Sequence, residues 1–117
     1  MEIDVLGTKY TITRVDSGQD EYIGKMHYGG YCDGFTKKIV ILNLKSVPEW
    51  ANDAMSSVRT EEKCTLRHEL IHAFLNESGL KYNSGSPKSW ATNEEMVDWI
   101  AIQSPKIFKA FKKAKAI

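Results

Sequence analysis

Two histidines and a glutamate in the middle of the chain have the types and the spacing of a metal site. Residues 65–75 read Thr-Leu-Arg-His-Glu-Leu-Ile-His-Ala-Phe-Leu, with His68 and His72 four residues apart. Side chains four apart on a helix leave the same face one turn apart, so both imidazoles can bind one ion. Glu69 stands beside them, where a carboxylate can take a proton from a water that the ion activates and give it to a leaving amine. This HExxH pattern predicts a Zn²⁺ ion with Glu69 as the catalytic residue.

A helix over residues 61–78 is expected to position this motif. Thr60 fits the N-cap, and two glutamates follow in the first turn, where the helix dipole favours carboxylates. Gly79 fits the left-handed position that ends many helices. Apolar residues occupy most of the helix surface: Leu66, Leu70, Ala73 and Phe74 in one stripe, with Cys64, Ile71 and Leu75 on the histidine side. The helix should therefore be buried on most sides, and a shared metal explains two buried histidines better than separate core hydrogen bonds do.

A catalytic zinc ion needs a third protein ligand beyond the two histidines. The extended motif that supplies a glycine and a third histidine is absent, because Leu75 and Ser78 stand at those positions. His27 is the one other histidine, and an ordinary hydrogen-bonded or exposed role is favoured for it.

The segment Asn93-Glu-Glu-Met-Val-Asp98 resembles the Asn-Glu-x-x-x-Asp pattern of the gluzincin peptidases. That resemblance implies Glu94 as the third zinc ligand and Asp98, one turn later on the same face, as the residue that orients a ligating histidine. Thr92 and Glu95 fit a capping box, which would give Glu95 a structural role at the helix start. Glu95 stays the alternative third ligand.

The remaining elements follow from local patterns. Residues 2–5 and 9–15 alternate apolar positions and predict a hairpin, and residues 37–44 contain three successive β-branched residues, which favour a strand. A second long helix should run to about Gln103, and Ser104-Pro105 should begin a third helical segment. The sheet is expected to be small, antiparallel or mixed, with three or four strands.

Several features together resemble the small HExxH proteins of phages and prophages, which are related to the ImmA/IrrE-like minimal gluzincins. They are Tyr31-Cys32-Asp33 before the strong strand, the motif helix ending at Gly79, and the stretch from Glu94 to Ala101. The resemblance covers about residues 29–104. It implies an α+β, minimal zincin fold, in which the sheet packs on the HExxH helix and on a downstream glutamate helix. It also implies a zinc metallopeptidase that hydrolyses a peptide bond in a protein or peptide and is encoded by a phage or prophage.

The same resemblance gives expectations about the substrate. In zincins a sheet-edge strand before the motif helix borders the cleft, so an extended substrate is expected to pair with the strand from Phe35 to Leu42. The donor that stabilises the oxyanion is left open among five side chains: Tyr82, Tyr28, Tyr31, His27 and Arg67.

Composition bounds the class of protein. The 117 residues, 42% hydrophobic and 26% charged, fit one domain over residues 1–117. The net charge of +1 argues neither for nor against a nucleic-acid partner. No apolar run approaches the roughly 20 residues of a membrane span, and the N-terminus lacks signal-peptide features, so a cytoplasmic protein with no membrane partner is expected. Cys32 and Cys64 show no metal-binding spacing and are expected to be reduced thiols.

Two other functions remain open. One is a catalytically silent zinc-binding regulator or adaptor, which loss of Glu69 would indicate, although Glu69 is present. The other is a nucleic-acid-associated protease similar to SprT-like proteins, suggested by C-terminal lysines. These are Lys106, Lys109, Lys112, Lys113 and Lys115. A solvated helix face explains them more simply, so a nucleic-acid partner is not favoured.

Overall fold

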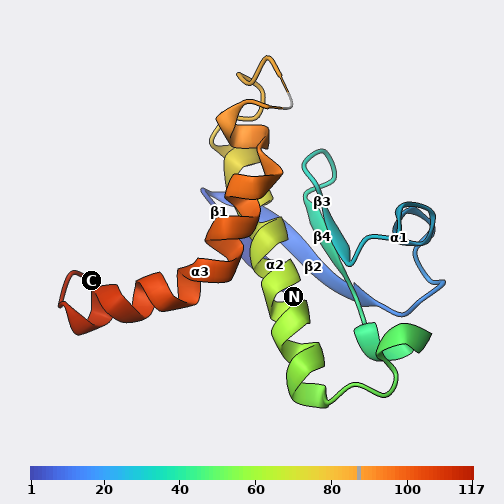
Figure 1. Ribbon diagram of the computed structural model, residues 1–117. Coiled ribbons are helices and arrows are strands. Elements are labelled where there is room, and N and C mark those ends of the chain that lie inside the picture. Colours follow the sequence, from blue (N-terminus) through green and yellow to red (C-terminus); the bar gives the residue numbers. More distant parts are fainter. Residues whose placement is uncertain (87) are drawn as a thin grey trace.

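Four strands form one mixed sheet, and the long helix α2 packs against it (Figure 1). The computed structural model describes residues 1–86 and 88–117. The strands are β1 (Glu2–Val5), β2 (Thr8–Val15), β3 (Gly30–Asp33) and β4 (Lys38–Leu42), in the order β1-β2-β4-β3. β1 is antiparallel to β2, β2 is parallel to β4, and β3 is antiparallel to β4. The expected α+β class with a small mixed sheet is confirmed.

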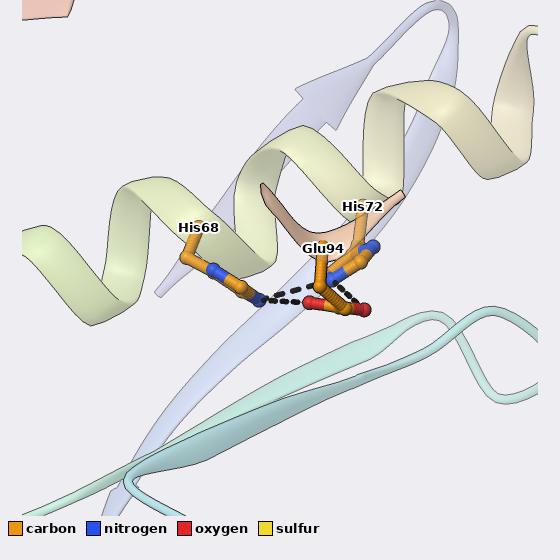
Figure 2. Close-up of side chains that lie close together, drawn as sticks. All are labelled: His68, His72 and Glu94. Carbon is orange, nitrogen blue, oxygen red and sulfur yellow. Dashed lines mark hydrogen bonds and ion pairs between the residues drawn. The ribbon is translucent and has the colours of Figure 1, made fainter. Parts of the chain in front are cut away.

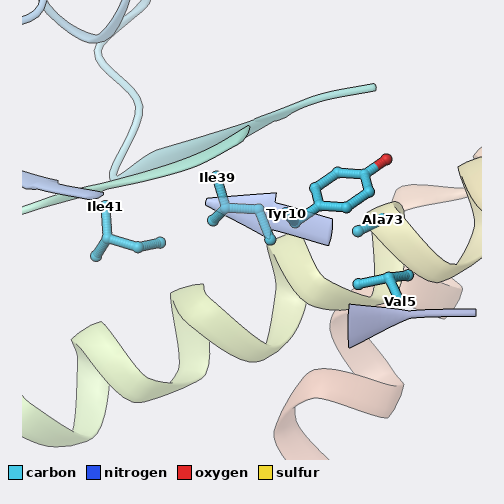
Figure 3. Close-up of a cluster of buried hydrophobic side chains, with 5 residues drawn as sticks. All are labelled: Val5, Tyr10, Ile39, Ile41 and Ala73. Atoms are coloured by element: carbon cyan, nitrogen blue, oxygen red, sulfur yellow. The ribbon is translucent and has the colours of Figure 1, made fainter. Parts of the chain in front are cut away.

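The main core lies between the sheet and α2 (Figure 3). Tyr10 of β2 and Ile39 of β4 are fully buried there, because alternate side chains of each strand face the helix. Val40, between Ile39 and Ile41, is also buried, on the other face of the sheet. β4 is thus an inner strand with both faces covered, which explains its continuous apolar sequence.

The motif helix α2 extends from Met55 to Glu77 and begins six residues before the expected start. Ala54 precedes it without a side-chain cap, and Thr60 lies inside the helix, where its hydroxyl donates to the Ser56 carbonyl at 2.8 Å. The earlier start is explained by packing, since Val58 is fully buried. The end is close to expectation, with Gly79 at a φ of +83°. Phe74 departs from the expected apolar stripe, because 43% of its surface is exposed.

The second long helix, α3 (Glu94–Lys113), packs against α2. The expected break at Ser104-Pro105 is wrong, since the helix continues through Pro105. Figure 1 instead shows α3 turning away from the body in its second half. A proline inside a helix removes one hydrogen bond and crowds the preceding turn, which accounts for the bend.

Short elements complete the chain. The helix α1 (Glu21–Met26) connects β2 to β3, and single 3₁₀ turns occupy Leu44–Ser46, Pro48–Trp50 and Trp90–Thr92. Both cysteines are free thiols, as expected. Of the helices in the described residues, none is long and apolar enough to cross a membrane.

Candidate metal centre and its groove

Two helices bring together three potential metal ligands. His68 and His72 leave one face of α2, and Glu94 reaches them from the first turn of α3 (Figure 2). The Nε2 atoms of the two histidines lie 3.0 Å apart. The Glu94 carboxylate oxygens lie 3.2 Å from the first of these nitrogens and 3.3 Å from the second. The sequence-based ligand set is therefore adjacent in space, with one ligand atom from each residue within 4.8 Å of the others.

This donor set fits zinc in both chemistry and spacing. Imidazole nitrogen and carboxylate oxygen are ligands that zinc takes in catalytic sites. Ligand atoms about 2.0–2.1 Å from a tetrahedral zinc ion lie about 3.4 Å from one another. The observed separations of 3.0 to 3.3 Å are close to that value. The three side chains are thus arranged so that one ion can bind all of them.

Asp98 contacts the ring nitrogen of His68 that faces away from the other two ligands. Its Oδ1 lies 2.7 Å from Nδ1 of His68. A carboxylate can only accept, so the proton of the neutral ring is held on Nδ1, and Nε2 presents its lone pair toward His72 and Glu94. The role implied for Asp98 by the gluzincin pattern agrees with this contact.

Glu69 lies beside the ligands but is not one of the three. Its Oε1 is 4.0 Å from Nε2 of His68, and only 7% of the residue is exposed. Burial raises the pKa of Glu69 to about 7, with smaller contributions from the negative charges of Glu94 and Asp98. Burial also lowers the pKa of His72, which favours the neutral ring that a metal requires. A carboxyl group with a pKa near neutrality can both accept and donate a proton.

The ligands and Glu69 line one side of a cavity of about 440 Å³, and β3 lines the other. Gly30, Tyr31 and Cys32 supply the strand side. A Cβ atom on Gly30 would lie 2.8 Å from the Val40 carbonyl oxygen and 3.1 Å from Cγ2 of Thr65 on α2. A side chain at this position would clash with the backbone of β4, and glycine also leaves room for Thr65 of the motif helix.

The expected pairing of a substrate with the strand from Phe35 to Leu42 is wrong. That segment contains β4, whose backbone is already paired with β2 on one side and β3 on the other. The edge strand that borders the cavity is β3. Local sequence patterns do not predict which strand lies at the edge, because strand order depends on pairing between distant parts of the chain.

Glu95 lies apart from the donor group. It lines a different hollow, together with Trp90 and Trp99. The expected capping box is also wrong, because Asn93 is the N-cap and its Oδ1 accepts from the Met96 amide at 2.9 Å. The Thr92 hydroxyl instead donates to the Ser86 and Ser89 carbonyls.

The five oxyanion-donor candidates are placed differently by the structure. Tyr28 and Tyr31 line the cavity, but the Tyr31 hydroxyl donates to Asp20 at 2.9 Å. Arg67 donates to a backbone carbonyl of α3. His27 caps the end of α1, away from the three donors, and Tyr82 is 63% exposed. Tyr28 also lines the cavity, and its hydroxyl makes no hydrogen bond to another described residue, so it is the candidate that remains available.

Sequence reasoning missed two polar side chains that line this cavity, Asn76 and Lys81. Asn76 lies one turn beyond His72 on α2, so helical spacing could have revealed it. Lys81 follows the left-handed Gly79, which reverses the chain toward the cavity. Cys32, which the sequence predicts as a reduced thiol, also lines the cavity, and burial raises its pKa to about 12, so the thiol stays protonated.

Comparison of the chain with protein-family models, curated proteins and solved structures finds no match. The basis for a function is therefore the arrangement of the side chains described above.

Proposed function

We propose that this protein is a zinc-dependent peptidase of the minimal gluzincin type, which hydrolyses a peptide bond in a protein or peptide. The observation that carries the proposal is the convergence of Nε2 of His68, Nε2 of His72 and the Glu94 carboxylate, with Glu69 buried beside them. The resemblance of the motifs to small phage and prophage HExxH proteins supports the same class and a phage or prophage origin.

The roles of the side chains follow from their positions. Zinc held by His68, His72 and Glu94 would supply a Lewis acid, which lowers the pKa of water and polarises a carbonyl group. Glu69 accepts the proton that water loses as its oxygen attacks the carbonyl carbon, and it donates that proton to the nitrogen of the leaving amine. Asp98 holds the proton on Nδ1 of His68, so that Nε2 is available as a ligand.

The edge strand β3 is proposed to bind the backbone of the substrate. An edge strand has backbone N–H and C=O groups available for an added strand. β3 borders the same cavity as Glu69. A peptide extended along β3 would therefore have its backbone fixed next to the proton-transfer group.

The proposal is tested by zinc content and hydrolysis measured on the same samples. Purified protein should contain close to one zinc per chain by elemental analysis and should cut peptides in a mixture derived from phage and host proteins. Glu69→Gln should keep the zinc and lose hydrolysis, because an amide cannot accept the proton. Glu95→Gln is the matched control, since it removes a nearby carboxylate outside the donor group, and it should keep both properties. Loss of zinc in Glu69→Gln would make Glu69 a ligand and the proposed roles wrong.

The same experiment separates the proposal from a catalytically silent regulator. Such a protein would bind zinc through the same three residues and cut no peptide with Glu69 intact.

The nucleic-acid alternative depends on the exposed lysines in the projecting half of α3, such as Lys106, Lys109 and Lys113. Those lysines lie on a helix segment beyond the donor group, so the chemistry of the site does not depend on them.

A further inference from the structure

A second hollow continues the catalytic cavity along β3. It has a volume of about 400 Å³ and shares Tyr31, Cys32 and Lys81 with the cavity that contains Glu69. Lys38, at the start of β4, and Asp33, at the end of β3, lie in the second hollow only. We call the two hollows together the β3 groove. A peptide long enough to reach Glu69 along β3 would also occupy the second hollow.

The charges of the second hollow are unbalanced. Lys38 and Lys81 both line it. Among the described residues, neither lysine forms an ion pair with a carboxylate within 4 Å. Asp33 is the one acid in the lining, and its Oδ1 accepts from the backbone amides of Phe35 at 2.9 Å and Thr36 at 3.2 Å. A hydrogen bond from the Thr36 side chain, followed by those from the backbone amides, lowers the pKa of Asp33, and the positive charge of Lys38 lowers it further. The hydrogen bonds hold the Asp33 carboxylate on the turn between the strands. Lys38 interacts with the charge of Asp33 at a longer distance, but two ammonium groups face one carboxylate in the lining, so the second hollow keeps a net positive charge that can attract an anion.

Lys38 is positioned by a contact with the aromatic ring of Tyr31, which lines the groove. Its Nζ lies over the Tyr31 ring at 5.8 Å from the centroid, which is within the range of a cation–π contact. The ring is fixed in turn, because its hydroxyl donates to Asp20 at 2.9 Å and Tyr22 packs edge-on against it at 5.0 Å. The ammonium group is thus positioned at the groove before a substrate arrives, which reduces the entropy lost on binding.

We propose that Lys38 and Lys81 bind a substrate carboxylate near the scissile bond, which makes this a peptidase selective for an acidic position in its substrate. The inference rests on the proposed peptidase function, because the scissile bond is located by Glu69. The carboxylate comes from an Asp or Glu side chain or from the free C-terminus of a peptide. Both sources present the same group to the two lysines.

The test uses a peptide mixture from a digested proteome, with cleavage sites read by mass spectrometry. Zinc-loaded wild type should show acidic residues enriched at one fixed distance from the cut. The ratio of cutting at acidic over neutral sequences should fall about 2- to 5-fold in Lys38→Gln and again in Lys81→Gln, as for other partly exposed charge pairs. It should invert toward basic residues in the Lys38→Glu/Lys81→Glu double variant. Lys109→Gln, in the projecting half of α3, is the matched control and should keep the wild-type ratio. Repeating the digestion with C-terminally amidated peptides separates the two sources, because only C-terminal recognition is lost on amidation.

A binding measurement distinguishes failure of this inference from failure of the peptidase proposal. Glu69→Gln protein is mixed with the same peptides, and the retained peptides are identified. Retention of acidic peptides that disappears in Glu69→Gln/Lys38→Gln/Lys81→Gln supports the groove even if wild type cuts nothing. If wild type cuts peptides without acidic enrichment, or if the lysine variants keep the same enrichment, the groove assignment is overturned while the peptidase stands. Equal retention of acidic and neutral peptides by Glu69→Gln protein would overturn it as well.

Discussion

Arg67 of α2 donates from Nε to the carbonyl oxygen of Ala101 in α3 at 2.6 Å. In a regular helix this carbonyl would accept from the amide of residue 105, four positions later. That residue is Pro105, which has no N–H group. The guanidinium of the motif helix therefore takes the place of the missing amide, and it fixes α3 against α2 one residue away from His68.

This relationship gives a first prediction, in the form of a double-mutant cycle. Arg67→Met should lower the free energy of unfolding by about 1.5 kcal/mol, because it leaves a carbonyl without its charged donor. In a Pro105→Ala background the same change should cost about 1 kcal/mol less, since the amide of residue 105 can then bond to the Ala101 carbonyl. Urea unfolding of the four proteins provides the measurement. Strict additivity of the two changes would mean that Arg67 does not compensate for the proline.

A second prediction concerns the metal ligands. Glu94→Gln should weaken zinc binding by orders of magnitude, and Glu95→Gln should not, because the Glu94 carboxylate lies within reach of both imidazoles whereas Glu95 lines a different hollow. Asp98→Ala should weaken zinc binding by roughly 10- to 100-fold, as for other residues that hydrogen-bond to a ligating histidine. Competition with a chromogenic chelator gives the affinities. A reversed order of the two glutamates would place the third ligand on Glu95.

The start of α3 supplies a third prediction. Asn93→Ala should lower the free energy of unfolding by about 1 kcal/mol, because the Met96 amide loses its side-chain acceptor. Glu95→Ala should cost less than this, since Glu95 takes no part in the cap. Thermal or urea unfolding at neutral pH measures both. Equal losses in the two variants would restore the capping box that the sequence suggested.

A fourth prediction follows from Glu77 at the end of α2. Its carboxylate accepts from Lys37 at 2.5 Å, from the Tyr10 hydroxyl at 2.7 Å and from the Thr8 hydroxyl at 3.0 Å. The hydrogen bond from Lys37, followed by that from Tyr10, lowers the pKa of Glu77 to about 2. The folded state therefore binds this proton less readily than the unfolded state does, so the stabilisation is complete above the unfolded pKa and is lost as the pH falls toward about 2.

The measurement for Glu77 is urea unfolding of wild type and Glu77→Gln between pH 7 and pH 2. Wild type should be more stable at pH 7, and the difference should shrink below about pH 4.5 and close near pH 2. Glu61→Gln removes an exposed carboxylate from the same helix and serves as the control. A difference between wild type and Glu77→Gln that does not change with pH would show that the carboxylate charge contributes nothing.

Local patterns predicted the elements that carry the site. The spacing of His68 and His72 and the glycine at 79 indicated a helix that presents both imidazoles on one face, and the structure has this helix. Thr60 and Thr92 do not cap the helices that the sequence predicted them to cap. Residues able to cap a helix are common in connecting segments, so their presence alone does not locate a helix start. At the start of α3, two adjacent residues, Thr92 and Asn93, are both suitable, and hydrogen bonds to the loop before it occupy the threonine.

The strand order could not be derived from local patterns. β4 is an inner strand because β2 pairs with it in parallel across an intervening helix and strand. One signal in the sequence did point to this position: Ile39, Val40 and Ile41 are apolar on both faces, which is typical of an inner strand. The lysines of the β3 groove gave no such signal, since Lys38 and Lys81 meet only through the folding of segments 43 positions apart.

The bend at Pro105 divides α3 into two parts that should differ in their resistance to local opening. Val97 and Ala101, before the bend, are fully buried, whereas Phe108 and Phe111, after it, are 54% and 43% exposed. Tertiary contacts therefore hold the first part, and the second depends mostly on its own helical hydrogen bonds. Backbone amides of residues 106–113 should exchange with deuterated solvent much faster than those of residues 97–103. Fraying of the C-terminal turns would leave Glu94 and Asp98 in place, since they lie about three and about two turns before the proline.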